Sequence, residues 1–123
     1  MIWNGGVVLY FGPMKYLPLL LFAATPAFAE APVVEAVTYS GGSFSVTLSH
    51  PDSGWDHYAD GWRIELADGT ILGTRVLAHP HVNEQPFTRS DQIMVPDGVD
   101  EVCVRTSDNV EGWADETTPF ALN

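Results

Sequence analysis

The residues of this chain best suited to chemistry are its four histidines, two of which are separated by a single proline. His79 and His81 flank Pro80 at the point where an apolar run ends. Alternate residues of an extended segment point to the same side. Pro80 favours an extended conformation at His79 and removes one backbone donor. The segment therefore presents two imidazoles on one side of a stiff stretch, which is half of a zinc or copper site.

The other candidate metal ligands are His50, His57 and Glu84, with Asp56 as a further carboxylate. Imidazole combined with carboxylate suits Zn(II) or Cu(II), whereas Ca(II) prefers oxygen ligands alone. The alternative is that the histidines bond to carbonyl and carboxylate groups and so fix long loops. A His-X-His pair does not by itself decide between a metal site and loop architecture, and both interpretations stay open.

A second candidate site consists of aromatic residues, Trp55, Tyr58 and Trp113, in segments rich in glycine and polar residues. Exposed aromatic side chains supply a large contact area at low entropic cost and are frequent at binding hot spots. These residues predict a module that contacts a protein or a glycan, as an alternative to metal binding. The competing interpretation is that they cover one end of the core.

Catalysis has no support in the sequence. There is no Gly-X-Ser-X-Gly nucleophile motif and no glycine-rich phosphate motif, and the one lysine is Lys15. We therefore expect a binding protein rather than an enzyme, with no catalytic residues and no cofactor apart from copper or zinc. A metal-assisted hydrolase is the alternative if three histidines leave an open coordination position.

The amino end carries the pattern of an export signal. Lys15 precedes a short apolar block at residues 17–24, and Ala27-Phe28-Ala29 places small residues at −3 and −1 of a cleavage site. We expect a signal peptide over residues 1–29 with cleavage before Glu30. The chain would then be periplasmic or secreted.

The start of the signal has its own interpretation. Residues 1–13 precede a second methionine, Met14, and add nothing that a signal needs, which suggests a mis-assigned start. The rival to cleavage is an uncleaved anchor, because Val7–Ala29 carries one charge and is long enough to span a bilayer. After cleavage, we expect residues 30–123 to form a single domain with no membrane contact.

That domain is strongly acidic. It has 123 − 29 = 94 residues, and with Lys15 removed four arginines face sixteen acids, so its net charge is 4 − 16 = −12 with neutral histidines. Such a charge disfavours nucleic acid and anionic membranes as partners and attracts cations. The expected partner is a metal ion or an exported protein or glycan. Because Cys103 is the single cysteine, no internal disulfide can form.

Short apolar runs, rich in Val, Ile, Phe and Thr and punctuated by glycine and proline, predict an all-β domain. Alternation over Ser43–Ser49 indicates one face in the core and one in water. Asp68-Gly69 and Pro96-Asp97-Gly98 are strong turn signals. Seven strands are predicted, near Val33–Thr38, Ser43–Ser49, Trp62–Ala67, Ile71–Ala78, Phe87–Val95, Val99–Thr106 and Thr117–Leu122.

Two stretches resemble the fibronectin type III family. Val102 to Trp113 followed by Thr117–Leu122 is similar to that family's last two strands, and Gly61–Leu66 with Asp68-Gly69 resembles its middle strand and hairpin. The sequence departs from the family at Val102, where a tyrosine is usual. The resemblance implies a seven-stranded, immunoglobulin-like antiparallel sandwich, and it implies little about function because many functions use that fold.

The sandwich predicts where the unusual residues lie. Strands that run alternately up and down would bring three loops, residues 50–61, 79–86 and 107–115, to one end. All four histidines and the three aromatic residues of the second candidate site would gather there. Loops held by a rigid scaffold often carry function. We expect Trp62 in the core, and Cys103 on the face opposite to its two valine neighbours.

Overall fold

In the computed structural model, which describes residues 30–123, the chain forms two antiparallel β-sheets and no helix long and apolar enough to cross a membrane. The predicted signal segment lies outside the described residues. The first sheet has the order β1 (Val33–Ser40), β2 (Ser43–Ser49), β5 (Phe87–Gln92). The second has the order β4 (Ile71–Val76), β3 (Ala59–Glu65), β6 (Glu101–Asp108), β7 (Gly112–Trp113), and β8 (Thr118–Ala121) also pairs with β6.

The prediction of an all-β fold is confirmed, but the described residues contain eight strands where seven were predicted. The additional strand is β7, which pairs Trp113 with Ser107 inside a segment predicted to be a loop. Such a two-residue strand is too short to show an alternating pattern. Between β7 and β8 four residues, 114–117, lie opposite only Arg105 and Thr106 of β6, so the chain bulges away from the sheet there.

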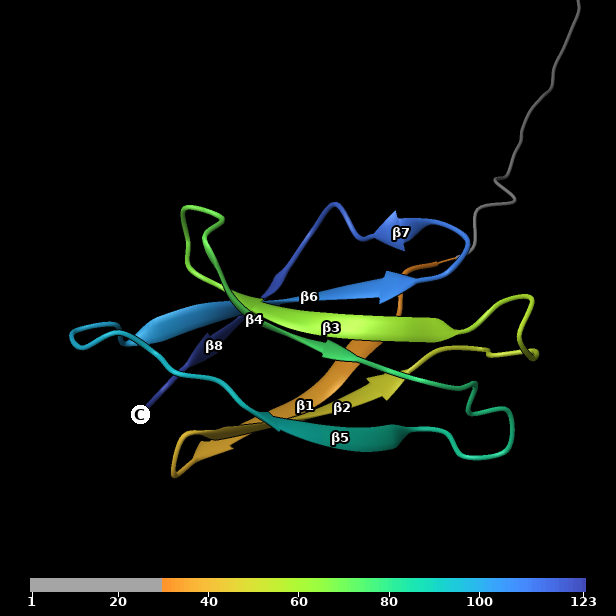
Figure 1. Cartoon of the computed structure of the whole chain (residues 1–123), viewed down its shortest axis with the longest axis horizontal. Coiled ribbons are helices and arrows are strands. Elements are labelled where there is room, and N and C mark those ends of the chain that lie inside the picture. Colours follow the sequence, from red (N-terminus) through yellow and green to blue (C-terminus); the bar gives the residue numbers. More distant parts are fainter. Residues whose placement is uncertain (1–29) are drawn as a thin grey trace, which may run out of the picture.

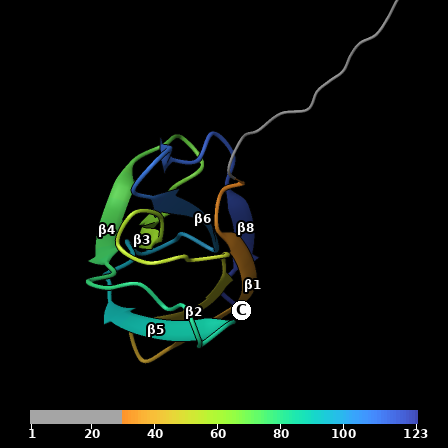
Figure 2. The ribbon, with the colours of Figure 1, turned by 90° about the vertical axis from the view of Figure 1, so that its right-hand side faces the viewer.

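One face of each sheet contributes to a shared hydrophobic core. Figure 2 shows the two sheets on opposite sides of the molecule. In β2 the inward residues Phe44, Val46 and Leu48 are buried, and in β6 Val102 and Val104 are buried in the same alternating phase. Burial of one such side chain stabilises the fold by about 1.5–3 kcal/mol. The core therefore depends on the two-residue period of these strands. It also contains Trp62, as predicted.

Three loops gather at one end of the molecule, at the right in Figure 1. They are the β2–β3 loop (residues 50–58), the β4–β5 loop (residues 77–86) and the β6–β7 loop (residues 109–111). Three further connections, β1–β2, β3–β4 and β5–β6, lie at the opposite end (Figure 1). The predicted sorting of the loops is thus present, and it brings distant parts of the sequence together.

The outer face of the second sheet is held by charged side chains around Glu65, which is only 2% exposed. Its carboxylate accepts hydrogen bonds from Arg63 Nε and Arg105 Nε, both at 2.7 Å. The hydrogen bond from Arg105, with that from Arg63, holds the pKa of the Glu65 carboxyl below its usual range despite its burial. Arg63 in turn lies over the ring of Trp113, 4.2 Å from its centre. Trp113 is therefore packed on this face.

We predict that Gly73→Ala destabilises the fold. A Cβ at Gly73 in β4 would lie 2.9–3.1 Å from three carbons of Ile93, which is 5% exposed and closes the core beside that strand. Overpacking of this kind costs about 1–3 kcal/mol. Urea unfolding measures the loss. The double variant Gly73→Ala/Ile93→Ala, which removes all three of these carbons, should lose less than the sum of its single changes, whereas strict additivity would show that the two residues are not in conflict.

Candidate functional site

Three groups that can ligate a metal ion meet at the loop end of the core, from His50, His57 and Asp108. His50 Nε2 lies 3.8 Å from Asp108 Oδ2, and His57 Nε2 lies 3.8 Å from Asp108 Oδ1. Each residue offers one metal-ligand atom, and these three atoms lie within 4.8 Å of one another. The side chains of His50 and Asp108 are fully buried, and that of His57 is 24% exposed. We call these residues the triad.

His50 and Asp108 reach this place by continuing the inward phase of two strands. His50 follows Phe44, Val46 and Leu48 at steps of two, and Asp108 ends β6 in phase with Val104. Side chains two residues apart in a strand point to the same face. Because β2 and β6 belong to different sheets, the triad spans the end of the core between them.

His57 is brought back to His50 by a tight turn. Ser53 N donates to His57 O at 3.0 Å, and His57 N donates to Gly54 O at 3.1 Å. Gly54 has a φ of 142°, which side-chain-bearing residues rarely adopt. The turn places the rings of His50 and His57 with their centres 4.7 Å apart and nearly perpendicular.

Asp52 fixes the protonation of His50. His50 Nδ1 lies 2.6 Å from Asp52 Oδ1, and both side chains are fully buried. A carboxylate only accepts hydrogen bonds, so Nδ1 carries a proton, and in the neutral imidazole the lone pair is then on Nε2, the nitrogen nearest Asp108. Asp52 also accepts from the backbone N–H of Ala59 at 3.0 Å and of His81 at 2.9 Å. This buried carboxylate is therefore well satisfied.

Asp108 uses one carboxylate oxygen to hold the following turn. Its Oδ1 accepts from the backbone N–H of Val110 at 2.8 Å and of Glu111 at 2.7 Å. The other oxygen, Oδ2, has no hydrogen-bond partner among the described residues, and neither does Nε2 of His50 or of His57. Leaving a buried polar group unpaired costs about 1–3 kcal/mol.

The triad fits a transition-metal ion. Two imidazole nitrogens and a carboxylate oxygen are a common catalytic-type zinc set, and a tetrahedral ion with bonds of about 2.1 Å places ligands about 3.4 Å apart. The two 3.8 Å distances end on different oxygens of Asp108, and one ligand atom from each residue lies within 4.8 Å of the others, so the side chains would have to close by up to about 1.4 Å to take this geometry. The hydrogen bond from His50 to Asp52 is the outer-shell support that metal-bound histidines usually have.

The predicted pair His79 and His81 is brought together, with ring centres 4.6 Å apart, but in other surroundings. The His81 ring stacks on Phe87, with centres 3.8 Å apart, and its Nε2 accepts from Arg89 at 2.8 Å. Glu84 is 59% exposed and lies 3.9 Å from His81 Nε2. Among residues 30–123 the one three-ligand group is the triad, which includes the predicted His50 and His57 but none of these residues.

The predicted aromatic site is divided. Trp55 and Tyr58 pack edge to face with ring centres 5.5 Å apart, and Trp55 is 66% exposed at the tip of its turn. Trp113 instead lies over Gly61 and Arg63 on the outer face of the second sheet. Of the three predicted aromatic residues, Trp55 and Tyr58 therefore form a pair at the loop end, and Trp113 lies separately from them.

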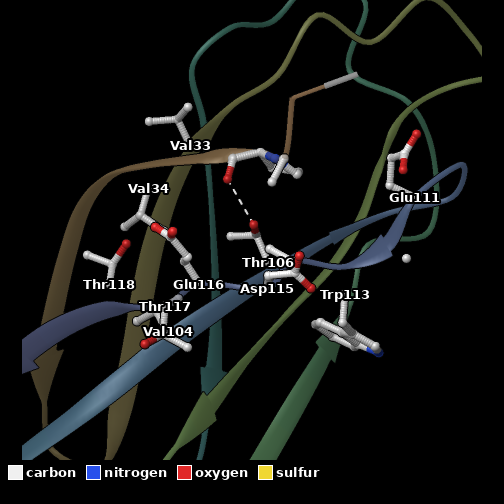
Figure 3. A pocket seen from close by; sticks show the side chains of 14 residues that line it. Val33, Val34, Val104, Thr106, Glu111, Trp113, Asp115, Glu116, Thr117 and Thr118 are labelled. Carbon is white, nitrogen blue, oxygen red and sulfur yellow. Dashed lines mark hydrogen bonds between the residues drawn. The ribbon is translucent and has the colours of Figure 1, made fainter. Parts of the chain in front are cut away.

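Another groove is lined by no histidine, and Figure 3 shows the side chains around it. It has a volume of about 720 Å³ and runs between the start of β1 and the bulge that follows β7. Val34 and Val104 contribute apolar surface, and Glu111, Asp115 and Glu116 contribute carboxylates. A shallower groove of about 560 Å³ lies between the β2–β3 turn and the β4–β5 loop, and Trp55 and His79 line it.

Comparison with known proteins finds one informative relative. A protein of Halomicrobium mukohataei that is described as a "putative lipoprotein" is 47% identical to this chain over 88 residues. The matched part is 68% of this chain and 43% of the relative, so the chain spans less than half of that protein's length. No model of a known protein family matches the chain, and no solved structure matches it.

Asp108 is the triad residue that the sequence interpretation did not select. It was assigned to the loop of residues 107–115, which follows the strand predicted near Val99–Thr106. The sequence does contain a signal for Asp108, because it lies an even number of residues after Val102 and Val104 and so points to the same inward side of the strand. A carboxylate at an inward strand position needs a buried partner.

We predict that His81 titrates below the ordinary histidine value of about 6.5. Burial lowers the pKa of the His81 imidazole, and the charge of Arg89 lowers it further. A depressed pKa means that His81 contributes stability that is complete above pH 6.5 and is lost as the pH falls through its folded pKa. NMR titration of its ring protons measures the value.

Arg89→Gln should raise that pKa, and Arg75→Gln in β4 is the matched control that should leave it unchanged. A value at or above 6.5 in the unmodified protein would show that burial and Arg89 do not hold the imidazole neutral.

Proposed function

We propose that this chain is an exported domain that binds a transition-metal ion, zinc or copper, through His50, His57 and Asp108. One observation carries the proposal: each of these residues has a buried side-chain nitrogen or oxygen with no hydrogen-bond partner among residues 30–123, and each offers a ligand atom within 4.8 Å of those of the other two. A bound cation would satisfy all three at once. The same donor set also holds Fe(II) in some oxygenases, so iron belongs among the ions to be tested.

The electrostatics of the chain favour a cation. The domain's net charge of 4 − 16 = −12 raises the local concentration of positive ions, and the triad adds a buried carboxylate. Nitrogen ligands select Zn(II) or Cu(II) over Ca(II) and Mg(II), which prefer oxygen. The chain would work by binding and not by catalysis, because its sequence has no motif for a nucleophile or a phosphate-bearing cofactor.

The proposal includes a fold and a location. The order β1-β2-β5 beside β4-β3-β6 and the shared core support an immunoglobulin-like sandwich of the fibronectin type III kind. The Ala27-Phe28-Ala29 pattern supports export to a periplasm or to the outside of the cell. The name of the relative, which describes a lipoprotein, agrees with export of this chain as well.

Calorimetric titration tests the metal site. We expect one Zn(II) or Cu(II) per chain with a Kd at or below micromolar, which corresponds to about −8 kcal/mol. His57→Gln removes a ligand at the partly exposed position and should weaken binding by about 100-fold or more, beyond the range typical of outer-shell changes. At a free metal concentration of 100 Kd, the unmodified protein should gain about 2.7 kcal/mol of stability.

The double variant His79→Ala/His81→Ala is the matched control, because it removes two histidines from the same end of the molecule and spares the triad. It should keep its metal affinity. If it loses binding while His57→Gln retains it, the ion binds the His79–His81 pair. If no ion binds at micromolar concentration, the triad is a packing arrangement only.

A second candidate function is favoured by the exposure of Trp55. An aromatic side chain that is 66% exposed and lines a groove is available to a protein or glycan partner. In that case Trp55→Ala should change the free energy of unfolding by less than about 0.5 kcal/mol. A loss of about 1.5 kcal/mol or more in urea unfolding would assign Trp55 to the packing of its loop instead.

A further inference from the structure

We propose that Asp52 is a positioning residue, which sets the metal-binding tautomer of His50 and joins the triad to the β4–β5 loop. The proposal rests on the metal site proposed above. The hydrogen bonds of Asp52 go to His50 Nδ1 and to the backbone N–H groups of Ala59 and His81, and none goes to an atom proposed to bind the ion, so Asp52 acts on the site through hydrogen bonds. Its side chain is fully buried, and both of its oxygens are engaged by groups from three different segments.

The first part concerns which nitrogen of His50 can bind an ion. With Nδ1 donating to Asp52 Oδ1 at 2.6 Å, the proton is on Nδ1 and the lone pair is on Nε2, which lies 3.8 Å from Asp108 Oδ2. The opposite tautomer would place an N–H group against the ion and could not bind it. Asp52 therefore selects the one tautomer of His50 that can ligate a metal.

The second part concerns the β4–β5 loop. Asp52 Oδ2 accepts from the backbone N–H of His81 at 2.9 Å. Gln85 adds a parallel connection, because its Oε1 accepts from His50 N at 3.0 Å and its Nε2 donates to His81 O at 2.9 Å. The loop is thus attached to His50 along two routes. An ion that fixes His50 would reduce local opening of this loop, since a loop without regular structure depends on such bonds.

The tautomer can be tested without metal. In protein labelled with ¹⁵N at histidine and held at a pH where His50 is neutral, its two ring nitrogens should show the shifts of a protonated Nδ1 and an unprotonated Nε2. Asp52→Asn should give a mixture of tautomers at His50. Asp56→Asn removes the same charge from an exposed position of the same loop and should keep the original tautomer.

Zinc binding and amide exchange test the coupling. Asp52→Asn should raise the Kd for Zn(II) about 10- to 100-fold, as loss of outer-shell partners usually does, and Asp56→Asn should leave it unchanged. Zinc should slow hydrogen exchange of the His81 amide in the unmodified protein. In Asp52→Asn this protection should be smaller even at a zinc concentration that saturates the variant, because only the route through Gln85 remains.

The outcomes separate the two proposals. A proton on Nε2 of His50 in the unmodified protein, or an Asp52→Asn variant with unchanged tautomer and zinc affinity, would overturn the role of Asp52. Failure of the unmodified protein to bind zinc, copper or iron would overturn the metal site, and with it any transmission of metal binding to the loop. The ¹⁵N result needs only the unmodified protein, so it decides the tautomer even if Asp52→Asn does not fold.

Discussion

The alternation of inward and outward residues along β2 and β6 is the constraint on which both the core and the triad depend. The inward positions of β2 are Phe44, Val46 and Leu48, and the next one is His50. Those of β6 are Val102, Val104 and the buried Thr106, and the strand ends at Asp108. A polar group at such a position is excluded from water and needs a buried partner. Asp52 satisfies one nitrogen of His50, and two turn amides satisfy one oxygen of Asp108. The remaining atoms of both residues face each other across the two sheets.

Much of the fold could be predicted because strand positions and turns follow from local patterns. Ser43–Ser49 was predicted with the bounds that β2 has, and the Asp68-Gly69 turn was placed correctly between β3 and β4. β7 could not be predicted, because it exists through its pairing with the end of β6 and not through its own sequence. The same holds for Trp113, whose packing on Arg63 depends on that pairing.

The candidate site could be predicted only in part, since residue type was visible and surroundings were not. His50 and His57 were selected as histidines of one loop end. His79 and His81 do lie on one side, as their spacing implied, but Phe87 and Arg89 determine the environment of His81. These two residues belong to β5, and only the folded chain places them against the imidazole.

The three triad residues come from different parts of the fold, so an ion bound to them would connect those parts. His50 follows a strand of the first sheet, Asp108 ends a strand of the second, and His57 lies in the loop that connects the sheets. A chain with one cysteine cannot join the sheets by an internal disulfide. An ion at the triad would form that link. Because the hydrogen bonds of Asp52 and of the turns already hold the ligands near their places, little ordering would oppose binding, and the affinity of the site would come from preorganisation.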